Sequence, residues 1–155
     1  FWKWWPNLKP DLHTLRVTGG EPLLSPSTFK LMDDFVREAA PNLHLAINSN
    51  LGIPKVLFEK FLTSSKLILD KKAVKNLKVF TSVDAYGEKA EYIRNGFKND
   101  IFWNNVEALL AAHDEIEIVI MCTFNALSVT SADQMVLKVT ELNTKYKKLN
   151  RVTPI

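Results

Sequence analysis

Leu15-Arg16-Val17-Thr18-Gly19-Gly20-Glu21-Pro22 is the stretch that decides the fold of this chain. An apolar run ends there at two glycines, an acid and a proline, which predicts a buried strand that breaks into a tight turn. Gly19 and Gly20 tolerate positive φ and let a ligand approach the backbone. Pro22 fixes the path by which the chain leaves the strand. The turn therefore places Glu21 at the carboxyl end of a strand, where α/β sheets and barrels bind ligands.

The chemistry of this turn is that of a hydrogen-bond acceptor. It offers a carboxylate and bare carbonyls, so it suits an ammonium or an amide donor, whereas a phosphate would prefer N–H groups and a Lys or Arg side chain. A plain strand-to-helix turn with an exposed Glu21 is the alternative interpretation, and the turn alone does not separate the two.

Strand and helix patterns alternate along the rest of the chain. Strands are expected at 15–18, 43–47, 77–83 and 117–124, and 151–155 resembles the start of another. Helices are expected at 26–39 after the cap Ser25, 55–64, 88–94, 100–112 capped by Asp100, and from the capping box Ser131-x-x-Gln134 onward; Pro41 ends the first, and 67–75 is ambiguous. This alternation predicts an α/β fold with a parallel sheet and four successive β-α units, within a single domain spanning 1–155.

Three successive strands end in residues that suit a ligand. The second strand closes on Asn48-Ser49-Asn50, and the third closes on Ser82-Val83-Asp84, with Arg94 shortly after it. Since the carboxyl ends of parallel strands share one edge, these residues are expected to converge with Gly19-Gly20-Glu21-Pro22. A zwitterionic amino acid would use them all, with its ammonium at Glu21 and its carboxylate near Ser82 and Arg94. Alternatively, Asn, Ser and Asp form only local turns here.

Composition narrows the possible partners. The 155 residues carry a net charge of +3 and 24% charged residues, as in a soluble globular protein, which we expect in the cytoplasm. No apolar run reaches the roughly 20 residues that cross a bilayer, and so mild a charge does not favour nucleic acid. Cys122 is the single cysteine, so neither an intrachain disulfide nor an iron–sulfur cluster can be built from these residues alone.

Three isolated features are given structural interpretations. The aromatic cluster Phe1-Trp2-Lys3-Trp4-Trp5-Pro6 is expected to cover the sheet rather than to form a cation–π cage. His44 is interpreted as a solvent- or helix-facing strand residue rather than a catalyst. Cys122 is expected to be a buried apolar residue within the fourth strand.

These motifs, in this order and spacing, resemble those of the radical S-adenosylmethionine (SAM) enzymes. Thr18-Gly19-Gly20-Glu21-Pro22-Leu23-Leu24 is similar to the family's Gly-Gly-Glu-Pro motif, which binds the ammonium of SAM. Asn48-Ser49-Asn50 lies where the family has a Thr-Asn-Gly-like strand end. Ser82-Val83-Asp84 and Tyr92-Ile93-Arg94-Asn95-Gly96 resemble segments of the peptide-modifying subgroup, and by that resemblance Ser82 and Arg94 hold the carboxylate of SAM. The region 86–110 looks like proteins that carry a C-terminal twitch or SPASM domain.

The resemblance implies a larger parent enzyme. The family's Cys-x-x-x-Cys-x-x-Cys loop, which holds the 4Fe–4S cluster, lies upstream of Gly-Gly-Glu-Pro and has no counterpart in this chain. The chain therefore resembles an internal piece, about strands two to five of a partial (β/α)6 TIM-like barrel. Its partners would be the parent's cluster loop and C-terminal domain. The implied chemistry is reductive cleavage of SAM by the cluster, followed by hydrogen abstraction from a substrate.

Two other function classes stay open. In the first, Glu21 and Asp84 are the acid/base pair of a hydrolase with a barrel or flavodoxin-like fold. In the second, the chain is a non-catalytic scaffold whose exposed Trp2, Trp4 and Trp5 bind a partner protein.

The single cysteine gives a first prediction. Anaerobic reconstitution with iron and sulfide should leave this chain without a stoichiometric cluster, because one thiolate cannot hold it. Iron and sulfide analysis with absorption spectroscopy measures this outcome. A stoichiometric cluster on this chain would contradict the prediction.

Overall fold

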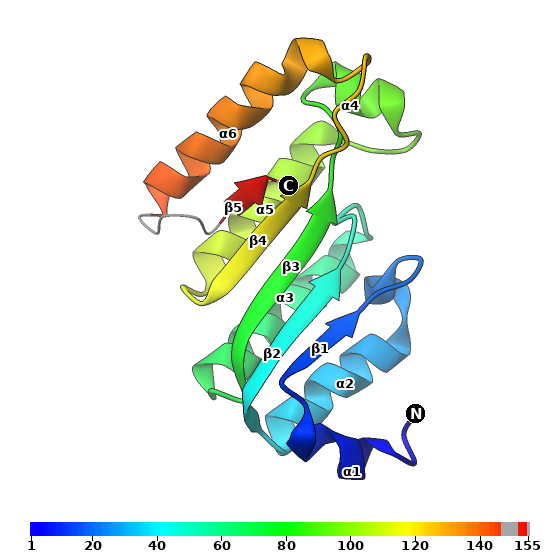
Figure 1. Cartoon of the computed structure of the whole chain (residues 1–155), viewed down its shortest axis with the longest axis vertical. Helices are drawn as coiled ribbons and strands as arrows, with labels where there is room; N and C mark the ends of the chain where they lie inside the picture. The colour runs from blue at the N-terminus through cyan, green and yellow to red at the C-terminus, as the bar shows by residue number, and fades with distance from the viewer. Residues whose placement is uncertain (147–151, 155) are drawn as a thin grey trace.

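The computed structural model describes residues 1–146 and 152–154 and contains one parallel sheet whose strands alternate with helices (Figure 1). The strands are β1 (Thr14–Val17), β2 (Ala40–Asn48), β3 (Val74–Ser82), β4 (Ile116–Met121) and the short β5 (Val152–Pro154). The helices are α1 (Trp5–Leu8), α2 (Pro26–Arg37), α3 (Lys55–Asp70), α4 (Glu88–Ile93), α5 (Asn99–Ala112) and α6 (Ala132–Lys145), with 3₁₀ turns η1 (Lys9–Asp11), η2 (Pro22–Leu24) and η3 (Val129–Ser131). The expected α/β class, parallel sheet and alternation of strands with helices are confirmed.

The strand order follows the chain. The sheet runs β1-β2-β3-β4-β5, and every neighbouring pair is parallel. Because the order never reverses and parallel crossovers keep one hand, the connecting helices fall on the same face of the sheet. Figure 1 shows α2, α3 and α5 behind the sheet, with the arrowheads of the strands at one edge. All strand carboxyl ends therefore meet at that edge.

The face of the sheet toward the helices forms the core. Its fully buried strand residues are Leu45, Ile47, Leu77, Val79, Ile116, Ile118 and Ile120. They form one cluster with helix residues that include Phe35 of α2, Phe61 of α3 and Phe102 of α5. Burying each of these large side chains contributes roughly 1.5–3 kcal/mol to stability, so the helices are held firmly on this face.

The opposite face is polar and faces the viewer in Figure 1. Arg16, His44, Lys78 and Glu117 alternate with the core residues and stay half-exposed or exposed. A sheet covered on both faces has continuous apolar strands, whereas this alternation is typical of a sheet with one solvated face.

Two predicted helix caps are wrong. Asp100 lies inside the first turn of α5, and the carboxylate of Glu91 caps that helix instead, since its Oε1 accepts from the N–H of Asn99 at 3.0 Å. Ser131 makes no capping bond, because η3 leads directly into α6 and its Oγ accepts from the N–H of Tyr86 at 3.2 Å. The Ser25 cap is confirmed, with Oγ accepting from the N–H of Ser27 at 3.3 Å.

Pro41 does not end α2 as predicted. The helix stops at Arg37, and Pro41 lies within β2, where the pairing with β3 shifts register between Ala40 and His44. Proline has no N–H to give to a sheet, so an irregularity is where a strand tolerates it. The ambiguous segment 67–75 is also resolved, because α3 continues to Asp70 and β3 begins at Val74.

The N-terminal aromatic cluster packs against α2, which the sequence did not indicate. Trp5 is only 3% exposed, and its ring meets that of Phe35 edge-on at 5.7 Å. Trp5 therefore cannot belong to an exposed partner surface, whereas Trp4 is 73% exposed. Trp5 therefore buries apolar area on α2, while Phe1 lines a cavity together with Leu15 and Val17 of β1.

A buried ion pair fixes the N-terminal segment to α2. Lys9, 4% exposed, donates from Nζ to Asp34 Oδ2 at 3.1 Å and to the Glu38 carbonyl at 2.7 Å. Trp5 Nε1 donates to the same Asp34 oxygen at 2.7 Å. Burial acts to raise the pKa of Asp34, but the bonds from Trp5 and Lys9 and the charges of Lys9 and Arg37 lower it below its ordinary value.

Asp34→Asn is expected to lower the free energy of unfolding by about 3 kcal/mol near neutral pH, because it leaves buried Lys9 with only the exposed carboxylate of Glu38, at 3.0 Å, as an anionic partner. The folded pKa of Asp34 lies below the unfolded one. The stabilisation by the Asp34 carboxylate is therefore complete above the unfolded-state pKa and is lost as pH falls through the folded-state pKa. Below that pH, the wild-type chain and Asp34→Asn should have similar free energies of unfolding. Urea denaturation at several pH values measures this. Asp33→Asn, an exposed neighbour on α2, is the control and should change stability by less than about 0.5 kcal/mol; equal losses in both variants would contradict the assignment.

Candidate functional site

A cavity of about 280 Å³ opens where the carboxyl ends of β1, β2 and β3 meet. It is lined by Thr18, Gly19, Gly20, Asn48, Ser49, Asn50, Phe80, Ser82 and Met121. Six of these nine residues were predicted to bind a ligand, and they come from three separate strand ends. Usual ligand pockets begin near 300 Å³, so this space suits an amino-acid-sized group.

The diglycine turn needs its glycines for conformation. Gly19 and Gly20 have φ of 105° and 25°, in the region that side chains avoid. A methyl group built on either would meet nothing within 4 Å, so the space above the turn is open. The turn therefore combines positive φ, which glycine tolerates, with an accessible backbone.

The carboxylate of Glu21 connects two strand ends. Its Oε1 accepts from the N–H of Leu23 at 3.1 Å, and its Oε2 accepts from the N–H of Asn50 at 2.8 Å. Pro22 is buried beside it, and the Pro22 carbonyl accepts from Thr28 Oγ1 at 2.7 Å. Glu21 is thus fixed in place by the turn after β2, 29 residues along the chain.

Glu21 and Pro22 line a second, adjacent cavity of about 550 Å³ rather than the first one. This space lies between β1 and α2, with Phe1 and Leu31 among its walls. Thr18, Gly19 and Gly20 line both cavities, so the diglycine turn is their common wall.

The side chains of Asn48, Ser49 and Asn50 serve local structure. Asn48 Oδ1 accepts from Arg16 Nε at 2.9 Å. Ser49 Oγ accepts from the N–H of Leu51 at 3.0 Å, and Asn50 Oδ1 accepts from that of Gly52 at 2.7 Å. The local-turn interpretation therefore holds for the side-chain oxygens of Ser49 and Asn50, whereas that of Asn48 binds the neighbouring strand, and all three residues still line the cavity.

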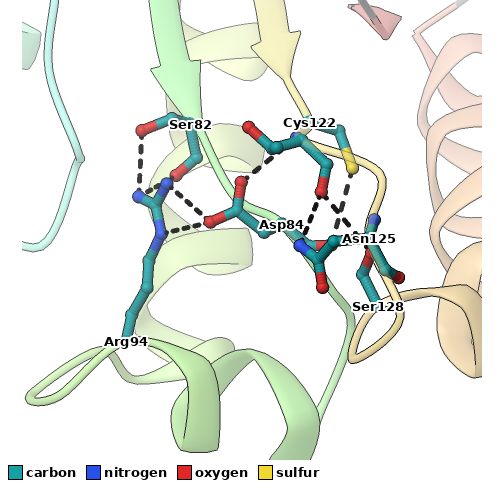
Figure 2. Close-up of polar contacts among 7 residues, drawn as sticks. Ser82, Asp84, Arg94, Cys122, Asn125 and Ser128 are labelled. Atoms are coloured by element: carbon teal, nitrogen blue, oxygen red, sulfur yellow. Dashed lines mark hydrogen bonds and ion pairs between the residues drawn. The ribbon is translucent and has the colours of Figure 1, made fainter.

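Ser82, Asp84 and Arg94 form one cluster after β3 (Figure 2). Arg94 donates from Nη1 to Ser82 Oγ at 2.9 Å and to the Ser82 carbonyl at 2.7 Å. Its Nε and Nη2 both lie 2.9 Å from Asp84 Oδ2. Asp84 therefore already balances the charge of Arg94, the cation that the sequence predicted for a ligand carboxylate.

Asp84 has a structural role that the sequence did not indicate. Its Oδ1 accepts from the N–H of Thr123 at 3.1 Å and so ties the end of β3 to the loop after β4. Asn125 and Ser128 brace that loop, since the N–H of Asn125 donates to Ser128 Oγ at 2.9 Å and its Nδ2 donates to the Thr123 carbonyl at 3.0 Å (Figure 2).

Cys122 lies just after β4 and is half-buried, so its expected place inside a buried strand is wrong. Its Sγ donates weakly to the Asp84 carbonyl at 3.6 Å. Burial, and next the charge of Asp84, raise the pKa of this thiol, while Arg94 acts in the opposite direction. The thiol form is favoured, which lowers nucleophilic reactivity.

Phe80 and Met121 line the strand-end cavity but were missed from the sequence. Both lie on the polar face, at positions that alternate with core residues such as Val79 and Ile120. The strand periodicity could have placed Phe80 and Met121 on this face, because alternate residues of a strand lie on the same face of the sheet. They were overlooked because an apolar residue at a strand end is normally assigned to the core.

Within residues 1–146 and 152–154, no group of three or more His, Cys, Asp or Glu side chains is placed to hold a metal ion. None of the helices in the same part of the chain is long and apolar enough to cross a membrane.

No protein-family model, curated protein or solved structure matches this chain.

Proposed function

We propose that this chain forms part of the core of a radical SAM enzyme and binds SAM at the carboxyl edge of its sheet. One observation carries the proposal: Gly19, Gly20 and Ser82 line one amino-acid-sized cavity at this edge, and Glu21 lines the adjacent cavity across the same diglycine turn. A ligand with an ammonium and a carboxylate on the same carbon requires acceptors and donors side by side. Glu21 and Ser82 are 61 residues apart in the sequence, and the parallel sheet brings both to the same edge.

The residues fit the amino-acid part of SAM. Each Glu21 oxygen accepts one N–H and keeps a second lone pair for an ammonium. The Ser82 hydroxyl, held by Arg94 Nη1, is the donor for the carboxylate. Asp84 reduces the attraction that Arg94 offers, so Ser82 is the main contact on this side. In the parent enzyme, SAM would supply hydrogen abstraction from a substrate once an electron from the cluster held by other segments cleaves it, while these residues bind and orient it.

The residues do not fit the iron–sulfur cluster. Cys122 is the only thiol of the chain and lies against Asp84 with a raised pKa, whereas a cluster requires several thiolates. We therefore assign no step to a cluster on these residues. In this proposal, other segments of the parent enzyme hold it.

The partial (β/α)6 barrel is part of the same proposal. A barrel wall has strands in chain order with all crossover helices outside, and this sheet has that winding. A doubly wound sheet would instead reverse its order and carry helices on both faces. The polar face would then be the inner face of the barrel.

The hydrolase alternative has less support. An acid/base pair has to face one substrate, but Glu21 lines the cavity beside α2, and Asp84 lines neither cavity. Arg94 and the N–H of Thr123 already bind the Asp84 carboxylate. A folded chain with no affinity for SAM would favour the non-catalytic scaffold instead.

SAM and S-adenosylhomocysteine are expected to bind this chain, and 5′-methylthioadenosine about tenfold or more weakly, because it lacks the amino-acid part. Glu21→Gln should weaken SAM binding by about tenfold or more, the effect of one hydrogen bond to a charged group. Isothermal titration calorimetry measures all three ligands. Glu59→Gln on α3, exposed and far along the chain, is the matched control. Equal affinities for SAM and methylthioadenosine would contradict the assignment of Glu21.

Ser82→Ala should weaken the binding of SAM by about tenfold and leave methylthioadenosine unchanged, because the hydroxyl contacts only the carboxylate. Ser64→Ala on α3 is the control and should change neither affinity. Circular dichroism of each variant checks the fold. If Ser82→Ala weakens both ligands alike, Ser82 does not recognise the carboxylate.

A further inference from the structure

A separate cavity of about 390 Å³ lies on the polar face of the sheet, below the strand ends. Its walls are Thr14, Arg16, His44, Leu45, Ala46, Asn76, Lys78 and Phe80. Neither the diglycine turn nor Ser82 lines it, so apart from Phe80 a ligand here would meet a different set of side chains.

The centre of this cavity is a small residue between two cations. Arg16 pairs in register with Ala46 on β2, and Ala46 pairs with Lys78 on β3. Neighbouring strands are about 4.8 Å apart, so the two basic residues begin roughly 10 Å apart on the backbone. Ala46 is only 6% exposed and contributes no more than a methyl group to the floor of the cavity, so its side chain takes up little of the space between the two cations.

The guanidinium of Arg16 is fixed in position and can still bind an anion. It lies 4.1 Å from the centre of the Phe80 ring, and its Nε donates to Asn48 Oδ1 at 2.9 Å. Among the described residues, nothing accepts a hydrogen bond from its two terminal nitrogens. A guanidinium fixed on one face and at one nitrogen loses little entropy when the other nitrogens bind a carboxylate side-on.

A series of hydrogen bonds orients the side chains on the other side of this cavity. Glu117 binds Lys78 Nζ through Oε2 at 2.8 Å and accepts from Asn76 Nδ2 through Oε1 at 3.3 Å. The amide oxygen of Asn76 therefore faces His44 Nδ1, 2.8 Å away, because the reverse orientation would set two oxygens together. His44 donates from Nδ1, and its Nε2 is the acceptor of the neutral ring.

We propose that this cavity binds a small carboxylate that carries a hydroxyl or amide N–H next to the carboxyl group. Arg16 and Lys78 bind the carboxylate over Ala46, and His44 Nε2 accepts from the adjacent donor. Two cations and the Glu117 carboxylate leave one net positive charge, which matches a monoanion. A phosphate monoester, with −1.5 to −2 charges at neutral pH, would meet repulsion from Glu117.

The position of this cavity suits a substrate. Phe80 lines both this cavity and the one at the strand ends. Arg16 and Lys78 lie two residues before Thr18 and Phe80, about 6.6 Å along the strands. The role as a substrate site rests on the proposed function, whereas the binding of a carboxylate rests on this face alone.

NMR titration of the ¹⁵N-labelled 155-residue chain tests the inference, with glycolate, N-acetylglycine and the neutral glycolamide as probes. Saturable shifts at Arg16, Ala46 and Lys78 are expected with either carboxylate and not with glycolamide. Tighter binding of glycolate indicates a 2-hydroxy acid, and tighter binding of N-acetylglycine indicates a peptide C-terminus. Arg16→Gln should weaken binding about tenfold or more, while Arg37→Gln on α2, an exposed control, should not.

Ala46→Leu is a second variant that fills the gap and keeps both cations, so it should also abolish the shifts. The inference is overturned if neither carboxylate saturates, if glycolamide or inorganic phosphate binds equally well, or if Arg16→Gln and Arg37→Gln behave alike. A SAM titration of the same samples separates the two proposals: carboxylate binding without SAM binding overturns the proposed function alone, and the reverse overturns this site alone.

Discussion

One constraint organises the molecule: each helix returns the chain across the same face of the sheet. Sequential parallel strands then end at a single edge, and turns that are distant in sequence become neighbours. The bond from the N–H of Asn50 to Glu21 closes that arrangement, because it joins the turns after β1 and β2. In the described part of the chain, the same winding places α2, α3 and α5 on one face, so the strand-end cavity and the cavity on the polar face both follow from how the strands are connected.

The polar groups at the strand ends have two roles. Asn48, Asn50 and Asp84 direct their oxygens to protein donors, and Glu21 accepts two backbone N–H groups. Such bonds fix the first layer around a cavity before any ligand arrives, which is what precise recognition requires. They also limit what the site offers, since Arg94 shares its charge with Asp84.

The fold class and the convergence of the strand ends were predictable from sequence, because apolar periodicity and turn residues report local structure. The partners of individual side chains were not. The sequence near Arg94 does not show that its guanidinium binds Asp84 rather than a ligand. The sequence near Ser131 does not show that its hydroxyl oxygen accepts from the N–H of Tyr86. Those choices depend on how the loop after β3 folds back on itself and, for Ser131, on a contact with a segment 45 residues away. The polar alternation of Lys78 with its apolar neighbours was visible, but its meaning depended on knowing that helices cover one face only.

The two cavities are connected physically through Arg16. Its Nε binds the side chain of Asn48, which lines the strand-end cavity, and its guanidinium stacks on Phe80, which lines both. A ligand at the strand ends that moves Asn48 or Phe80 therefore changes how Arg16 is held. Linkage then requires that an anion on Arg16 alter the affinity at the strand ends by the same factor. Since only one guanidinium and one ring join the cavities, this coupling depends on the Arg16 side chain more than on any motion of the sheet, whose core face is fully buried against the helices.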